Sequence, residues 1–191
     1  MPLPLALRIA LWSWLLAALA ASQSGLLGRL PAPVTPGILL GLTGLLVLAY
    51  RLIGAFRAWI DALDLRSLVL FHVTRFVGFY YLVLFNRGDL PYAFAVPGGL
   101  GDILVASLAL IVVFVPWSNS QRARFTYLWN VIGFIDLLLI VGTAVKYAFS
   151  RDSYELTELT RLPLSLQPTF LVPLLLGSHL AIFARLQRQE P

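Results

Sequence analysis

Several side chains that can carry a charge or a proton stand inside stretches of the sequence that are otherwise apolar. They are His72, Arg75, Asp102, Asn130, Asp136 and His179. Such groups are rare within a bilayer because burying them is costly, and they mark proton relays, ligand sites or packing pairs. Thiol chemistry is excluded, because the chain has no cysteine, and no serine–histidine–acid arrangement can be read from it. We therefore predict no catalytic residue, and a set of ligand-binding residues: Arg75, Asp102, Asn130, Asp136 and His179.

Asp136 is expected close to the middle of the membrane. At the rise of an α-helix it lies about 16 Å from the outer end of its apolar segment, and Arg75 comes to nearly the same depth. A carboxylate at that depth is either protonated or paired. We expect Asp136 to be ionised and paired with Arg75, with His179 nearby. The pair either fixes helix packing or serves as a relay for a proton or a substrate.

Asp102 is expected at the outer end of its segment, in the first turn of a helix that follows Gly98, Gly99 and Gly101. There it either caps the helix or acts as the entrance group of a ligand site. In the second reading, the glycines let a ligand approach exposed N–H groups of the backbone.

His72 and His179 are the two histidines of the chain. Two imidazoles from two helices can ligate one haem iron, but counted along straight helices their depths differ by about 6 Å. We therefore predict no cofactor and keep haem b, held by both histidines, as the alternative. No metal site is expected from Asp102, Asp136 and His179 either, because Asp102 would lie far above the other two.

Membrane helices must position these residues. The 191 residues are 59% hydrophobic and 12% charged, and apolar runs of about 20 residues, the length that crosses a bilayer core, recur along the chain. We predict an all-α membrane protein: a bundle of six transmembrane helices forming one integral membrane domain over 1–191, in contact with the lipid bilayer. The expected spans are about 3–22, 38–56, 67–86, 99–117, 125–148 and 168–187.

The connections between the spans carry further expectations. Residues 87–101 are too apolar for a solvated loop and too rich in proline and glycine for a helix, so we predict a folded, non-cytoplasmic elbow between the third and fourth helices. A short amphipathic helix is expected at 154–161. The small residues at Ala18–Ser22 resemble a signal-peptide cleavage site, but Arg8 stands inside the apolar run rather than ahead of it. We therefore expect a retained helix.

Basic residues near the helix ends predict the orientation, because short cytoplasmic loops carry an excess of arginine and lysine. One side holds eight: Arg8, Arg51, Arg57, Arg66, Arg122, Arg124, Arg185 and Arg188. The other side holds five: Arg29, Arg87, Lys146, Arg151 and Arg161. Both termini are thus expected in the cytoplasm. The net charge of +5 reflects these helix-end residues, so no nucleic-acid binding is expected.

Three strings resemble a family of small bacterial integral membrane proteins of unassigned function. They are RFVGFYYLVLFNRGDLPYAFAVPGGLGD, LWNVIGFIDLLLIVGTA and VPLLLGSHLAIF. The matching positions are Arg75, Gly78, Pro91, Phe94, Gly98, Gly101, Asp102, Trp129, Asn130, Gly133, Asp136, Pro173 and His179. The resemblance covers about 68–187 and leaves the first two spans outside. It implies no activity, and it implies a glutamine in most members where His72 stands here.

Together these observations predict a multi-pass protein of the bacterial inner membrane with a polar intramembrane cavity open to the outer face. We expect it to bind or move a small molecule or a proton rather than to be an enzyme. Two alternatives stay open. One is an accessory subunit of a larger membrane complex, associated with haem or quinone, and the other is a membrane-embedded enzyme that modifies lipids. A homo-oligomer is compatible with each.

Overall fold

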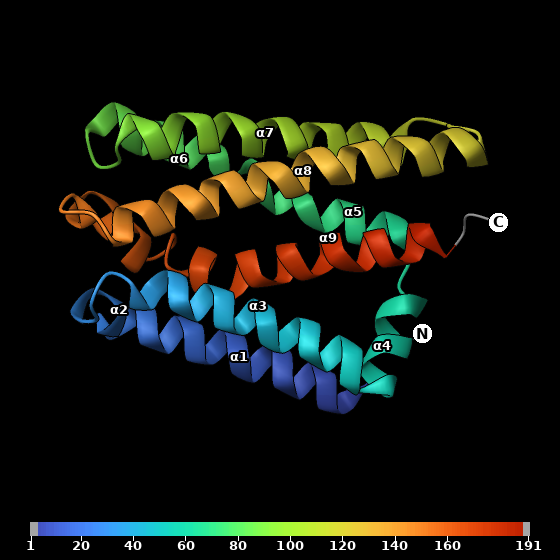
Figure 1. Ribbon diagram of the computed structural model, residues 1–191, viewed down its shortest axis with the longest axis horizontal. Helices are drawn as coiled ribbons and strands as arrows, with labels where there is room; N and C mark the ends of the chain where they lie inside the picture. Colours follow the sequence, from blue (N-terminus) through green and yellow to red (C-terminus); the bar gives the residue numbers. More distant parts are fainter. Residues whose placement is uncertain (1–3, 189–191) are drawn as a thin grey trace. The chain divides into compact units, whose positions relative to one another are not determined.

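The computed structural model describes residues 4–188, and these form an all-helical protein (Figure 1). Nine α-helices and three helical segments of other types follow one another along this part of the chain. The α-helices are α1 (Leu5–Gln23), α2 (Leu26–Arg29), α3 (Val34–Leu52), α4 (Gly54–Ala62), α5 (Leu65–Phe71), α6 (Gly78–Arg87), α7 (Tyr92–Phe114), α8 (Asn119–Ala148) and α9 (Val172–Gln187). The other segments are the 3-10 helices η1 (His72–Val77) and η2 (Ser153–Thr160) and the π-helix η3 (Gln167–Leu171).

Six helical segments within residues 4–188 are long and apolar enough to cross a membrane, which confirms the six predicted spans. Two of them are composite. The third span runs through α5, η1 and α6, and the last joins η3 to α9. The six segments are Leu5–Gln23, Val34–Leu52, Leu65–Arg87, Tyr92–Phe114, Asn119–Ala148 and Gln167–Gln187. The start expected for the first span, residue 3, lies outside the described residues.

The connection between the third and fourth spans is much shorter than expected. Helix α6 ends at Arg87, Gly88 closes it in the left-handed conformation with a φ of 80°, and α7 already begins at Tyr92. The elbow predicted over 87–101 is therefore wrong in extent, because only 88–91 form a turn. Pro97 lies inside α7, where a membrane helix tolerates proline and glycine if its neighbours pack closely.

Other segments differ from expectation in their bounds or their helix type, and the fifth span begins at Asn119 rather than near 125. The second span ends at Leu52 rather than near 56, because Ile53 is extended and a separate helix, α4, follows it. The apolar run continues across Ile53, so hydropathy alone does not reveal the break. The amphipathic helix expected at 154–161 is present as η2, although it is a 3-10 helix with a kink at Leu156.

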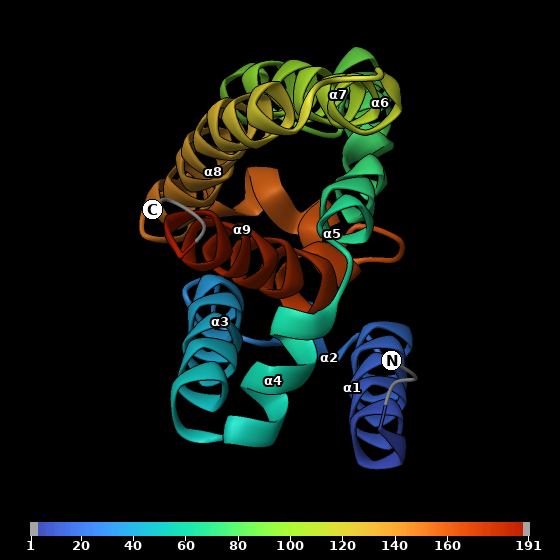
Figure 2. The same ribbon diagram turned by 90° about the vertical axis from the view of Figure 1, so that its right-hand side faces the viewer.

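The described residues fall into two compact units. The first contains the residues up to Ala62 together with Ala144–Gly177. In it, η3 packs against both α1 and α3. The indole nitrogen of Trp14 donates a hydrogen bond to the Thr169 carbonyl over 2.7 Å, which ties α1 to η3. Figure 2 shows α1 and α3 as separate helices on the two sides of α4.

The second unit contains Leu63–Thr143 and the residues from Ser178 onward. Helix α7 packs against α5, η1 and α6, and its small residues Ala106 and Ala109 are fully buried. Every residue of the predicted site belongs to this second unit. That the whole chain forms one membrane domain stays a prediction.

The orientation of the spans gives a first testable prediction. A reporter fused after Ser118, between α7 and α8, is expected on the cytoplasmic side, and one fused after Asp152 on the opposite side. The reason is that the ends on the side of Ser118 together hold eight basic residues against five on the other side. Activity of an alkaline phosphatase and of a green fluorescent protein fusion at each point measures the side. The same side for both fusions would contradict a membrane crossing by α8, and reversed sides would contradict the expected orientation.

Candidate functional site

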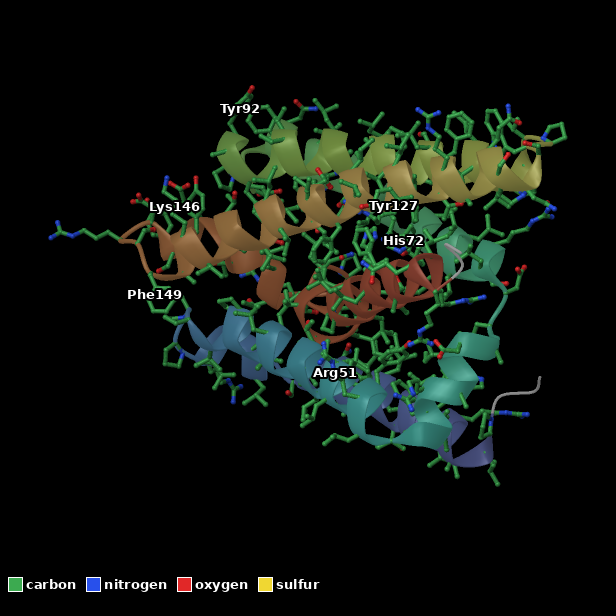
Figure 3. The ribbon with its side chains drawn as sticks, turned by 45° about the vertical axis from the view of Figure 1, so that its right-hand side comes forward. Arg51, His72, Tyr92, Tyr127, Lys146 and Phe149 are labelled. Carbon is green, nitrogen blue, oxygen red and sulfur yellow. The ribbon has the colours of Figure 1, made fainter. Side chains whose placement is uncertain are left out.

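Two of the polar side chains come from η1, the short 3-10 helix in the middle of the third span. In a 3-10 helix the side chains three residues apart eclipse one another, so His72 and Arg75 lie on the same side of η1. Both are buried, with 0% and 1% of their surface exposed. Figure 3 shows His72 among the helices, whereas Tyr92 projects outward at the start of α7.

The guanidinium of Arg75 joins three segments of the second unit. Its Nε donates to Asp102 Oδ1 on α7 over 2.6 Å, and its Nη2 donates to Asp136 Oδ2 on α8. Its Nη1 donates to the carbonyl of Gly133, also on α8, over 3.0 Å. We call Arg75, Asp102, Asp136 and the Gly133 carbonyl the Arg75 cluster. One buried cation thus holds two carboxylates from two different helices.

The predicted contact between Arg75 and Asp136 is confirmed, but Asp102 does not lie where the sequence placed it. It stands in the interior of α7, not in its first turn, because the helix begins at Tyr92. Capping the helix and guarding an entrance at its end are therefore both wrong for Asp102. The large separation expected between Asp102 and Asp136 is wrong as well, since both contact the same guanidinium.

Glycines make room for the cluster. A Cβ atom at Gly101 would overlap Asp136 Oδ1 and lie 2.7 Å from Asp136 Cγ. A Cβ atom at Gly78 would overlap the Gly99 carbonyl oxygen and lie 2.9 Å from Asp102 Cβ. The glycines of this region therefore let neighbouring helices approach, rather than exposing backbone N–H groups to a ligand.

The two histidines contact each other directly, with ring centroids 4.2 Å apart. The rings meet although counting along straight helices put the two residues about 6 Å apart in depth, because that count leaves out helix tilt and the 3-10 winding of η1. His72 Nε2 shares a hydrogen bond of 2.8 Å with Ser178 Oγ. Rings this close leave no space for a porphyrin between them, so the arrangement does not fit a haem ligated by both histidines.

Asn130 holds His179 by two hydrogen bonds. Its Nδ2 donates to the His179 carbonyl over 3.1 Å, and its Oδ1 lies 2.7 Å from His179 Nδ1. Trp129, the preceding residue, donates from Nε1 to the Val105 carbonyl over 2.9 Å. Asn130 is fully buried, so it positions the imidazole from within the protein.

Among residues 4–188, no three side chains of histidine, cysteine, aspartate or glutamate come together in a way that could hold a metal ion. Sequence reasoning missed two partners in this region, Ser178 and the Gly133 carbonyl. Ser178 gave a weak signal as a hydroxyl inside an apolar span, but serine in membrane helices commonly bonds to its own backbone. The Gly133 carbonyl gave none, because every residue has one.

Comparison with protein families decides the membership of the chain. Residues 33–187 match a family described as a domain of unknown function, DUF8737. The chain belongs to DUF8737. The DUF8737 match contains the whole Arg75 cluster and both histidines, and it begins before the second span. The range of 68–187 expected for the resemblance was therefore too short. Comparisons with curated proteins and with solved structures gave no match. Family and spans together show a multi-pass membrane protein.

Proposed function

We propose that this DUF8737 protein takes up and releases a proton at the Arg75 cluster, and that it moves a proton, or a small molecule together with one, across the membrane. The observation that carries the proposal is the sharing of one buried guanidinium by two carboxylates. The proposal includes the ligand-binding roles predicted for Arg75, Asp102 and Asp136, and it keeps the bacterial inner membrane expected from the sequence as the location.

Charge balance is the first argument. The Arg75 guanidinium stays protonated in proteins, whereas Asp102 and Asp136 each gain or lose a proton. With both carboxylates ionised, the three groups carry one negative charge in excess. An uncompensated charge inside a membrane protein is costly, and a shifted protonation state is the usual remedy. One added proton makes the cluster neutral, so the cluster has a place for one proton.

Access is the second argument. The side chain of Asp136 is 21% exposed, whereas Asp102 is 6% exposed and Arg75 only 1%. Asp136 is thus the more exposed carboxylate, and we assign it to the outer position, where a proton arrives first, and Asp102 to the inner one. This reverses the order expected from the sequence, in which Asp102 was the entrance group. In the same proposal Asn130 and His179 form the inner polar layer, because the His179 ring lies against Gly133, whose carbonyl accepts from Arg75.

Infrared spectroscopy of the full chain in lipid bilayers tests the proton site. We expect a carbonyl band of a protonated carboxyl group that changes with pH and is lost in both Asp102→Asn and Asp136→Asn. Either substitution leaves one carboxylate opposite one guanidinium, and that pair is neutral without a proton. Asp89→Asn is the matched control, because Asp89 is exposed in the turn between α6 and α7, and it should keep the band. A band that survives both cluster variants would contradict the proposal.

A further inference from the structure

Each of the two buried histidines has one ring nitrogen that forms no hydrogen bond with the described residues. His72 uses Nε2 for Ser178, and His179 uses Nδ1 for Asn130. The other two nitrogens, His72 Nδ1 and His179 Nε2, are buried and have no hydrogen-bond partner among residues 4–188. Buried polar atoms nearly always have a partner, so two open atoms in touching rings call for an explanation.

The hydrogen bonds of Asn130 define the tautomer of His179. Because the Asn130 amide nitrogen donates to the His179 carbonyl, the Asn130 oxygen faces the ring and can only accept. His179 therefore donates from Nδ1–H, and in the neutral ring Nε2 is a bare acceptor. The open atom is a lone pair, and it needs a donor.

The bare nitrogen lies beside the Arg75 cluster. A Cβ atom at Gly133 would be 2.8 Å from His179 Cε1 and 3.2 Å from His179 Nε2. The carbonyl of the same Gly133 accepts from Arg75. Around the ring stand Trp129 and Phe134, with centroids 5.6 Å and 5.8 Å from that of His179. Neither ring offers a hydrogen bond to Nε2, since the indole N–H of Trp129 is used by Val105.

We propose that His179 Nε2 is a binding site for a small O–H donor, with His72 Nδ1 as the neighbouring polar contact. The chemistry is that of a hydroxyl group, which comes either from an internal water molecule or from an organic ligand. The site is separate from the two carboxylates, and it extends the polar layer from Arg75 through Gly133 to Ser178. It does not depend on whether the carboxylates exchange a proton.

Nitrogen NMR of the full chain in bilayers tests this site directly. Because the chain has two histidines, ring-¹⁵N-histidine labelling gives four ring signals when no histidine tag is used. His179→Asn assigns them, since the asparagine amide can still donate to Asn130, and His72→Gln keeps the ε position that faces Ser178. We expect His179 Nδ1 to give the signal of a protonated ring nitrogen. We expect His179 Nε2 to give the signal of an unprotonated nitrogen that accepts a hydrogen bond, and to receive magnetisation from an O–H proton.

Mass spectrometry of an organic extract of the labelled protein distinguishes the two sources. Transfer from O–H protons without a stoichiometric small molecule in the extract indicates water, and a stoichiometric hydroxyl-bearing molecule in the extract indicates an organic ligand. Both support the site. Gly133→Ala should remove the transfer, because its Cβ would lie 2.8 Å from His179 Cε1 and displace the ring, while Gly142→Ala in the same helix, with nothing within 4 Å of its Cβ, should keep it.

Two results of the measurement on the wild-type chain would overturn the site, and neither of them requires that the Gly133→Ala variant fold. One is an Nε2 signal without any hydrogen bond and without transfer from O–H protons. The other is the opposite tautomer, with the proton on Nε2. Neither result affects the infrared carboxyl band. The nitrogen signals therefore test the binding site at His179, and the carboxyl band separately tests the proton site at the Arg75 cluster.

Discussion

Replacement of Arg75 by leucine is expected to lower the free energy of unfolding by about 3–5 kcal/mol, the range seen when one partner of a buried ion pair is removed. The substitution takes away the guanidinium that Asp102 and Asp136 share and leaves both carboxylates without it. Unfolding of the purified chain in mixed detergent micelles measures the loss. A decrease below about 1 kcal/mol, the size of an exposed ion pair, would contradict a buried cluster.

Double-mutant cycles separate the two carboxylates. Asp102→Leu combined with Arg75→Leu should be less destabilising than the sum of the single changes, with a coupling of about 1–3 kcal/mol. The coupling to Asp136 should be smaller than that to Asp102, because 21% of the Asp136 side chain is exposed against 6% for Asp102. Additive effects in both cycles would mean that Arg75 does not hold these carboxylates.

The chain offers a matched control for these cycles. Arg161 and Glu158 form an ion pair of 2.7 Å, and their side chains are 67% and 26% exposed. An exposed pair of this kind contributes about 0–1 kcal/mol, because water screens the charges. Arg161→Leu with Glu158→Leu should therefore give little coupling. Equal coupling in the two places would argue that burial does not strengthen the Arg75 cluster.

The second large effect is expected from Gly78→Ala. A Cβ atom there would overlap the Gly99 carbonyl and press on Asp102 Cβ at 2.9 Å, so α6 and α7 must move apart. We expect a loss of about 1–3 kcal/mol, as for other overpacked interiors. The backbone of α7 is the obstacle, and it cannot rotate away as the end of a flexible side chain would.

Gly142→Ala is the control for this substitution. Gly142 lies in α8, is exposed, and has nothing within 4 Å of its Cβ position. Alanine is a better helix former than glycine by about 1 kcal/mol, so this variant should be as stable as the wild type or more stable. The same unfolding assay compares the two. Equal stability of both variants would contradict the close approach of α6 and α7 at Gly78.

The six spans could be predicted from the sequence because the length of an apolar run is a property of the chain alone. That length is then compared with the thickness of a bilayer core. Boundaries that depend on packing could not. The segment from Tyr92 to Gly101 looks unsuited to a helix, yet it is the start of α7, where Gly98 and Gly99 are buried against neighbouring segments. The break at Ile53 interrupts an apolar run that continues on both sides.

Depth along a helix predicted the contact of Arg75 with Asp136, since both positions follow from counting residues from a span end. Depth alone could not bring in Asp102 or join the two histidines. The position of Asp102 depended on where α7 begins, and that of His72 on the 3-10 winding of η1, which places it on the same side as Arg75.

The sequence by itself therefore determined that this is a multi-pass membrane protein with costly polar groups deep in its spans. The tertiary structure alone decided which of those groups meet. The physical reason is geometric: hydropathy and residue counting give one coordinate, the depth in the membrane. Rotation about the helix axis, tilt and local winding are set by how side chains and glycines such as Gly78, Gly101 and Gly133 let the helices approach one another.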